Sequence, residues 1–257
     1  MIHSTVLIDP DARIGENVLI GPYSVIGQDV TIGDDTWIGP HVVIKGPTKI
    51  GKFNRIFQFC SIGDDPQDKK FNNDGNSMLE IGDHNTIREY CTINRGTDHG
   101  GGKTILGNDN WIMAYVHIAH DCIIGNNIIF ANNTTLAGHV LVDDYAIFGG
   151  FTRIHQFCQI GKYCFTAISS VVVKDVPPYL IISGNTAKPN GLNREGLKRH
   201  GFNAETINLL RKAYKIVYRE GLTVNLALEK LQELAEQSEE VRYFAEFISQ
   251  SKRGIVR

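Results

Sequence analysis

Four of the nine histidines lie in one stretch of the chain, at His117, His120, His139 and His155. A carboxylate, Asp121, directly follows His120. Imidazole gains or loses a proton near neutral pH, and a neighbouring carboxylate can fix the orientation of the ring. These residue types predict proton transfer by a general base, provided that the fold brings them together.

Isoleucine recurs at every sixth residue from Ile8 to Ile62, and the same frame returns at Ile81 and from Leu106 onward. A period of six is typical of a hexapeptide β-helix, in which three hexads close a triangular coil of 18 residues. The large aliphatic residue fills the interior, and we expect the frequent glycines to permit the tight corners. The predicted fold class is therefore mainly β, a parallel β-helix of hexapeptide repeats.

The hexad frame divides the chain into two predicted domains. The β-helix occupies residues 1–185, and a helical pattern predicts a small C-terminal α-helical domain at 186–257, with Thr223 and Ser238 as helix N-caps. Two insertions interrupt the frame near residues 63–80 and 94–105. Insertions in a solenoid often carry binding. The GGGKT run at 100–104 lacks the spacing of a phosphate loop, and we interpret it as a flexible loop.

Residues 18 positions apart stack on successive coils, as His120, Gly138 and Gln156 should. His139 and His155 adjoin this series, so we expect His120, His139 and His155 to form a column at one edge, with about 5 Å between coils. A structural ladder, a metal site and a catalytic cleft are the three interpretations. The cleft is favoured, because imidazoles interleaved with Gly and Gln make a poor tetrahedral zinc site. We expect neither a metal nor a cofactor.

Composition excludes several classes of function. The chain has 26 Lys+Arg against 28 Asp+Glu, a formal charge of −2, which argues against nucleic-acid binding. It lacks the run of about 18 apolar residues that a transmembrane helix needs, and its first residues do not resemble a signal peptide, so we expect a cytoplasmic protein. Each of the five cysteines is the fifth residue of its hexad, which predicts small buried core residues.

Some short runs are more specific than the hexad repeat: HIAHDC (117–122), LAGHV (136–140), HQFC (155–158), DVPPY (175–179), GLNREGLKR (191–199), IRE (87–89), RGT (95–97) and Gln67–Asp68 with Lys70. Together they resemble the acyl-(acyl-carrier-protein)–UDP-N-acetylglucosamine O-acyltransferase family of lipid A biosynthesis. The resemblance covers essentially the whole chain, including both insertions and the helical tail.

The resemblance implies a left-handed coil and a homotrimer with active sites between neighbouring β-helices. It implies transfer of an R-3-hydroxyacyl group from acyl carrier protein to the 3-hydroxyl of a UDP-sugar. His120 matches the general base, Asp121 its partner, and Gly138 the backbone N–H donor to the oxyanion. The positions matching substrate contacts are Asp68, Lys70, His117, His139, His155, Gln156, Asn193, Glu195 and Arg199, with Arg199 as the expected phosphate partner.

Two positions depart from the family pattern. Asn94 stands where many members have His, which leaves open whether the acceptor is UDP-N-acetylglucosamine or its 3-amino analogue. Ile168 stands where the family has a glycine that sets chain length, so we expect a bulky side chain at the end of the acyl groove. The preferred acyl chain is then nearer about ten carbons than about fourteen, because a packed groove has no spare volume.

Three alternatives remain at the level of the sequence. A sister N-acyltransferase acts on the 3-O-acylated sugar, but it carries a further N-terminal domain, whereas hexads begin here by residue 8. A hexapeptide zinc hydrase would hold stoichiometric zinc. A structural β-helix would leave the histidines and the two polar insertions unexplained.

Overall fold

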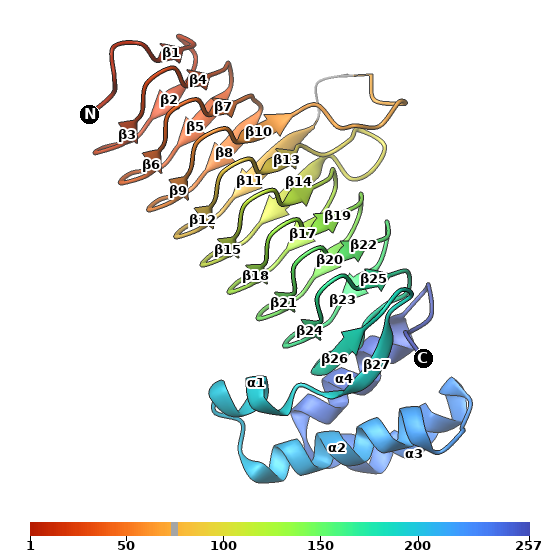
Figure 1. Ribbon diagram of the computed structural model, residues 1–257. Coiled ribbons are helices and arrows are strands. Elements are labelled where there is room, and N and C mark those ends of the chain that lie inside the picture. The colour runs from red at the N-terminus through yellow and green to blue at the C-terminus, as the bar shows by residue number, and fades with distance from the viewer. Residues whose placement is uncertain (73–76) are drawn as a thin grey trace.

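The computed structural model describes residues 1–72 and 77–257 as three sheets wound into a triangular prism, with helices packed at its C-terminal end (Figure 1). The strands are parallel except for the last pair of sheet 3, which is antiparallel. The chain passes from sheet 1 to sheet 2 to sheet 3 in every coil. We name the turns between them corner 1–2, corner 2–3 and corner 3–1. This arrangement confirms the predicted parallel β-helix.

The strands are short, and most of them have two residues. Sheet 1 contains β1 (Leu7–Ile8), β4 (Val25–Ile26), β7 (Val43–Ile44), β10 (Ser61–Asp64), β13 (Thr92–Asn94), β16 (His117–Ile118), β19 (Thr135–Leu136), β22 (Arg153–Ile154) and β25 (Val171–Val172). Sheet 2 contains β2 (Arg13–Ile14), β5 (Val30–Ile32), β8 (Thr48–Ile50), β11 (Met78–Ile81), β14 (Lys103–Leu106), β17 (Ile123–Ile124), β20 (Leu141–Val142) and β23 (Gln159–Ile160). Sheet 3 contains β3 (Leu19–Ile20), β6 (Trp37–Ile38), β9 (Arg55–Ile56), β12 (Thr86–Ile87), β15 (Trp111–Ile112), β18 (Ile129–Phe130), β21 (Ile147–Phe148), β24 (Phe165–Thr166), β26 (Leu180–Ser183) and β27 (Lys188–Leu192).

The hexad residues form the interior of the prism. Ile118 pairs in register with Leu136, and Leu136 with Ile154, so equivalent side chains stack 18 residues apart. All three are buried, and each fully buried aliphatic side chain contributes roughly 1.5–3 kcal/mol. The five cysteines are also buried and unpaired, as predicted. This register fixes which residues meet at each corner.

The corners turn in a way that the sequence interpretation did not foresee. Most have a non-glycine residue with positive φ, such as Asp121 (59°), His139 (62°) and Phe157 (63°). The hexad glycines serve instead to let the coils approach each other. A Cβ on Gly33, for example, would lie 2.6 Å from the backbone carbon of Gly51 on the next coil. The expectation that glycine supplies the corner conformation was therefore wrong.

Both insertions leave the prism on the same side (Figure 1). The first insertion runs from residue 65 to 77 between β10 and β11, and its residues 73–76 lie outside the described part of the chain. The second insertion, residues 95–102, lies between β13 and β14. Arg95 joins the two, because it pairs with Asp65 at 2.6 Å and donates from Nε to the Ser77 hydroxyl at 2.9 Å.

The C-terminal helices are α1 (Arg194–Arg199), α2 (Ala204–Arg219), α3 (Val224–Gln237) and α4 (Glu239–Gln250). Thr223 and Ser238 cap α3 and α4 with their side chains, as predicted. The last residues return to the prism, where Ile255 forms a β-bridge with Asp175. Among residues 1–72 and 77–257, no helix combines the length and apolar character that a membrane span needs.

Candidate active site

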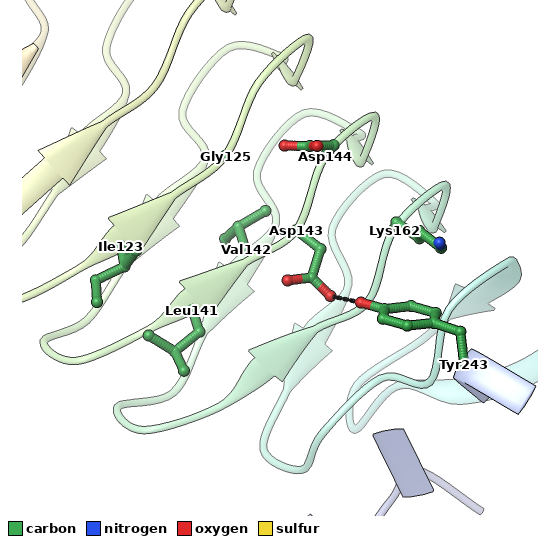
Figure 2. A pocket seen from close by; sticks show the side chains of 8 residues that line it. All are labelled: Ile123, Gly125, Leu141, Val142, Asp143, Asp144, Lys162 and Tyr243. Carbon is green, nitrogen blue, oxygen red and sulfur yellow. Dashed lines mark hydrogen bonds between the residues drawn. The ribbon is translucent and has the colours of Figure 1, made fainter. Parts of the chain in front are cut away.

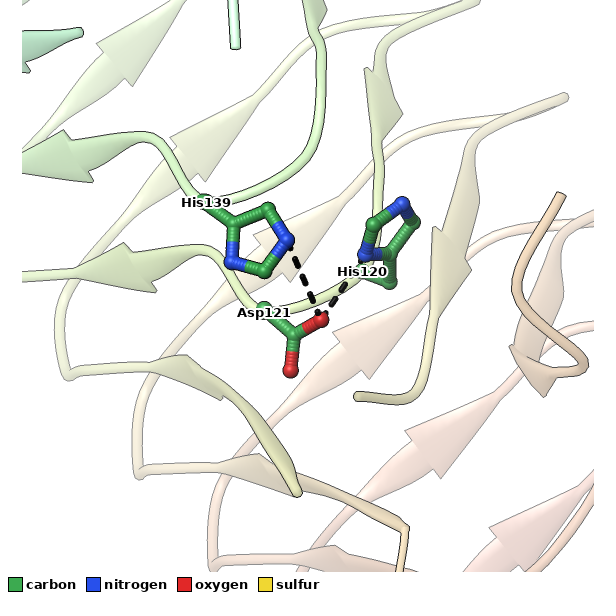
Figure 3. Close-up of side chains that lie close together, drawn as sticks. All are labelled: His120, Asp121 and His139. Carbon is green, nitrogen blue, oxygen red and sulfur yellow. Dashed lines mark hydrogen bonds and ion pairs between the residues drawn. The ribbon is translucent and has the colours of Figure 1, made fainter. Parts of the chain in front are cut away.

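The catalytic candidates His120 and Asp121 lie at corner 1–2, between β16 and β17. His120 Nδ1 is 2.8 Å from Asp121 Oδ2, as Figure 3 shows. The Asp121 side chain is 2% exposed and that of His120 is 15% exposed. The carboxylate is thus buried behind a ring that still reaches the surface.

This contact fixes the tautomer of His120. An ionised carboxylate only accepts hydrogen bonds, so the proton between the two groups belongs to Nδ1 of the imidazole. Nε2 then carries the lone pair. Within the described residues Nε2 has no hydrogen-bond partner, so it is available to accept a proton.

The surroundings of Asp121 keep it ionised. Burial acts against the charged form, but hydrogen bonds from His120 and from the Thr97 hydroxyl and amide outweigh burial, and the pKa of Asp121 is lowered. The Asp121 amide also donates to the Thr104 hydroxyl at 2.8 Å. These contacts hold the residue in its left-handed conformation, which aspartate tolerates.

His139 stands on the next coil, above Asp121. Its Nε2 lies 3.7 Å from Asp121 Oδ2, and its ring meets that of His120 edge-on at 5.1 Å between centroids. On its other side it stacks on Phe157 at 4.4 Å. Burial lowers the pKa of His139, which keeps it neutral. Two imidazoles therefore converge on one carboxylate oxygen (Figure 3).

Gly138 lies directly above the His120 ring. A Cβ there would be 2.6 Å from His120 Cε1, so only glycine leaves the ring its place. In the described part of the chain, the Gly138 N–H has no hydrogen-bond acceptor. It is thus a free donor next to the candidate base.

The first insertion brings Asp68 toward this corner. The Lys70 amide donates to Asp68 Oδ1 at 2.9 Å, and His99 from the second insertion lies 3.1 Å from Oδ2. The pKa of Asp68 is lowered, mainly by the Lys70 amide, with smaller effects of His99 and His120. The two insertions therefore meet in front of His120, and Lys70 is exposed beside them.

The predicted column of three imidazoles was only partly right. His120 and His139 touch, but His155 precedes the corner residue of its coil and turns elsewhere. Its Nδ1 lies 3.3 Å from Arg253 Nη2 of the C-terminal segment. Gln156, at the position equivalent to His120, is exposed. A shift of one residue at a corner changes the direction of the side chain, which a spacing of 18 alone does not describe.

His117 lies on the outer face of β16, three residues before His120. Its Nδ1 is 2.7 Å from the Thr92 hydroxyl of the coil below. Burial, and to a lesser extent His120, lowers the pKa of His117, so the ring stays neutral. It is a neutral hydrogen-bonding group at the rim rather than a charged one.

Other predicted binding residues lie on different edges of the prism. Helix α1 packs at corner 2–3, where His200 after it meets the rings of Tyr145 and Tyr163. There Asn193 uses its side chain to cap α1 and to donate to the Tyr163 carbonyl. Glu195 pairs with Lys198 at 2.9 Å.

Arg199 is exposed at the end of α1, and Ile168 lies at corner 3–1 with 70% of its surface exposed. Within one chain, these residues do not join His120. The predicted set therefore covers three edges rather than one cleft.

Asn94 has a structural position. It is 4% exposed, and its Nδ2 donates to the carbonyls of Asp64 and Asp65 at 3.3 and 2.8 Å. It thereby holds the start of the first insertion.

The GGGKT run is closely attached to the site. Gly100 and Gly102 donate to the Thr97 carbonyl, and Thr104 accepts from Asp121. These hydrogen bonds close the loop on itself and join the strand after it to Asp121, and the flexibility of the loop stays a prediction. The sequence interpretation assigned no role to Thr97, which it named only within the RGT run, and did not name Arg253, since neither lies in the hexad frame that placed the histidines.

A hollow of about 280 Å³ lies beside the carboxylate, lined by Asp121, His139, Phe157, Ile123, Leu141 and the basic pair Lys252 and Arg253, among others. His120, Asp121 and His139 offer three ligand atoms within 4.8 Å of one another. The carboxylate, however, already accepts hydrogen bonds from Thr97 and His120. The trio is better described as a hydrogen-bond network than as a zinc cage, which takes at least three open ligands in tetrahedral geometry.

A second hollow, of about 450 Å³, lies farther along sheet 2 beside α4 (Figure 2). There the Tyr243 hydroxyl donates to Asp143 Oδ2, and Lys162 Nζ lies 3.9 Å from the centre of the Tyr243 ring. These contacts attach α4 to the prism at this hollow.

Comparison with known proteins gives matches over the whole chain. The family model described as UDP-N-acetylglucosamine O-acyltransferase, domain 2, matches residues 175–256, and the bacterial transferase hexapeptide model matches residues 11–46 and 103–138. A Thiobacillus denitrificans protein named acyl-(acyl-carrier-protein)–UDP-N-acetylglucosamine O-acyltransferase is 54% identical over 256 residues, covering 100% of this chain and 99% of its own.

Solved structures agree. A Francisella novicida UDP-N-acetylglucosamine acyltransferase superposes with a TM-score of 0.98 at 46% identity, over 100% of this chain and 94% of that one. A Moraxella catarrhalis UDP-N-acetylglucosamine O-acyltransferase superposes with a TM-score of 0.97 at 46% identity, over 100% of this chain and 99% of that one. These matches confirm the predicted left-handed β-helix with a small helical C-terminal part.

Proposed function

Because this chain belongs to the acyl-(acyl-carrier-protein)–UDP-N-acetylglucosamine O-acyltransferase family, we propose that it transfers a 3-hydroxyacyl group to the 3-hydroxyl of the sugar, with His120 as the general base. It is an acyltransferase that takes its acyl group from acyl carrier protein and gives it to UDP-N-acetylglucosamine, the first step of lipid A biosynthesis.

One observation carries the proposed mechanism: the contact of 2.8 Å between His120 Nδ1 and a buried, ionised Asp121. A sugar hydroxyl is a poor nucleophile at neutral pH, whereas a thioester is already activated. Nε2 of His120 takes the hydroxyl proton as the oxygen attacks the thioester carbon. General-base catalysis of this kind contributes roughly 10²–10⁴-fold.

The attack turns the thioester carbonyl into an oxyanion. The free N–H of Gly138 is a donor for that charge, and the absence of a side chain lets the substrate approach the backbone. When the intermediate collapses, the C–S bond breaks and the carrier thiolate takes the proton from the His120 imidazolium. Neutral His120, the acylated sugar and the carrier thiol remain, so the base is regenerated in each cycle.

The site is shared between subunits of a homotrimer in this proposal. The support is that the predicted residues occupy three edges of one prism: His120 at corner 1–2, Arg199 near corner 2–3 and Ile168 at corner 3–1. Packing prisms side by side brings different edges together, and cyclic symmetry repeats each contact. The reaction takes place in the cytoplasm in this proposal, and no metal or cofactor takes part.

An assay of the purified protein tests the reaction. The protein is incubated with 3-hydroxyacyl carrier proteins and one of three acceptors: UDP-N-acetylglucosamine, its 3-amino analogue or UDP-3-O-acylglucosamine. The products are identified by mass spectrometry. We expect O-acylated UDP-N-acetylglucosamine. Acylation of the third acceptor alone would establish the sister N-acyltransferase instead.

Mixed oligomers test the shared site. His120→Ala and Arg199→Ala chains, each inactive by itself, are co-expressed in equal amounts. If one interface uses His120 of one subunit and Arg199 of another, about one quarter of the interfaces are intact, and about that fraction of activity returns. No recovery would place both residues in the site of a single chain or outside it.

Ile168 limits the acyl chain in this proposal. We expect wild-type protein to prefer donors of about ten carbons, and Ile168→Gly to shift the preference toward about fourteen, because the side chain fills the end of a packed groove. The ratio of kcat/KM for the two donors is the measurement. An unchanged ratio in the variant would remove Ile168 from the groove.

A further inference from the structure

The Asp121 carboxylate has a partner that the catalytic pair does not explain. Thr97, at the start of the second insertion, donates from its amide to Oδ1 at 3.0 Å and from its hydroxyl to Oδ2 at 2.6 Å. Oδ2 is the same oxygen that accepts from His120 Nδ1. Thr97 thus donates a hydrogen bond to each oxygen of the carboxylate that orients the base.

The contact is closed to water. Thr97 is 0% exposed and the Asp121 side chain is 2% exposed. A hydrogen bond to a buried charge is stronger than one in solvent, and its loss leaves the charge partly unsatisfied. Thr97 therefore affects both the charge and the direction of the carboxylate.

The loop around Thr97 is built to make this contact. The Thr97 carbonyl accepts from the amides of Gly100 and Gly102, which closes a turn. A Cβ on Gly100 would lie 2.3 Å from Asp121 Oδ2 and 2.4 Å from Thr97 Oγ1. The loop thus packs against the carboxylate with no room for a side chain.

We propose that Thr97 is a positioning residue for catalysis: it holds the Asp121 carboxylate in the orientation that keeps His120 Nδ1 protonated and leaves Nε2 to act as the base. This inference rests on the proposed role of His120. Thr97 touches no reacting atom and acts only through Asp121. The second insertion is then part of the catalytic apparatus.

A positioning role for Thr97 predicts a shift of the pH profile in one direction, which a merely structural role does not. The Thr97 hydroxyl withdraws negative charge from Oδ2 by donating to it. Without it, Oδ2 interacts more strongly with a positively charged imidazole, and the base stays protonated to higher pH. The acid limb of the kcat–pH profile should therefore move upward, while KM changes little.

Thr97→Val removes the hydroxyl, and Thr97→Ser keeps it. Thr134→Val is the matched control, because Thr134 is also 0% exposed and donates from Oγ1 at 2.8 Å, but to the carbonyl of Ala131 at corner 3–1. We expect Thr97→Val to lower kcat about 10- to 100-fold, the effect of one hydrogen bond to a charged group. Thr97→Ser should recover most of it, and Thr134→Val should keep wild-type kcat and pH profile.

A second measurement does not need turnover. The pH titration of the His120 ring protons, followed by NMR and assigned by their loss in His120→Ala, should move to higher pH in Thr97→Val. If Thr97→Val does not fold, Thr97→Ala removes the same hydroxyl without a new methyl group against the carboxylate.

Equal kcat, acid limb and NMR midpoint in the Thr97 variant and wild type would overturn the proposal. A failure of wild-type protein to transfer acyl groups would instead count against the proposed function, and the NMR titration would still decide the contact.

Discussion

Corner 1–2 and corner 2–3 have the same backbone turn and different uses. At corner 2–3 polar side chains join neighbouring coils: Asp144 Oδ1 accepts the Asn126 amide at 2.6 Å, and Asn126 Oδ1 accepts the Asn108 amide at 2.8 Å. At corner 1–2 the carboxylate of Asp121 instead accepts from Thr97 and His120. A corner can therefore hold catalytic groups when its side-chain acceptors are not already bonded to the amides of a neighbouring coil.

The second insertion accounts for this difference between the two corners. Along corner 2–3 the turns stack without interruption in the catalytic coils, so the amides of Asn108 and Asn126 each donate to the side chain 18 residues on. At corner 1–2 the second insertion adds Thr97, which supplies the donors that the carboxylate needs. The imidazole Nε2 and the Gly138 N–H are then left for the substrate.

The largest effect expected from this contrast is at the active corner. His120→Ala should lose at least about 10²-fold in kcat, because the base is removed, while the oligomer and the melting temperature stay near those of wild type. Steady-state rates with acyl carrier protein and gel filtration check this. Activity within a few-fold of wild type would show that the proton goes elsewhere.

A substitution at corner 2–3 should do the opposite: it should lower stability and leave kcat unchanged. Asn85 is fully buried, donates to the Gly107 carbonyl at 2.9 Å and accepts the Asn110 amide at 3.0 Å. Asn85→Ala should lower the free energy of unfolding by about 2–3 kcal/mol, because buried groups lose their partners. kcat should remain that of wild type at temperatures where the variant is folded. A loss of kcat without a loss of stability would contradict the division of roles between the corners.

The sequence predicts the prism more completely than the site. A six-residue period determines the register, so the stacking of Ile118, Leu136 and Ile154 follows from counting. The pairing of His120 with Asp121 follows from adjacency. The roles of Thr97 and Arg253 do not follow, because they depend on how a loop and the C-terminus fold back over the prism, outside the repeat. For the same reason His155, one residue from the predicted column, turns toward Arg253.

The smallest expected effect is a difference in how stability depends on pH between Asp143, at corner 2–3, and Asp121, at corner 1–2. Burial raises the pKa of Asp143, and the hydrogen bond from Tyr243 only partly opposes this. The folded chain therefore binds the Asp143 proton more tightly than the unfolded chain does, and this contribution to stability is lost as pH rises through the folded pKa.

Asp143→Asn should thus leave stability at neutral pH unchanged or slightly higher, and the difference should vanish toward pH 4, where the unfolded carboxyl, with a pKa of about 3.9, also takes up its proton. Asp121 has a lowered pKa, so its contribution has the opposite sign: it is present above the unfolded pKa and lost as pH falls through the folded one. Asp121→Asn should therefore destabilise at neutral pH. Thermal unfolding of both variants from pH 4 to 8 measures the two signs, and curves that shift in the same direction would mean that the two carboxylates experience the same environment.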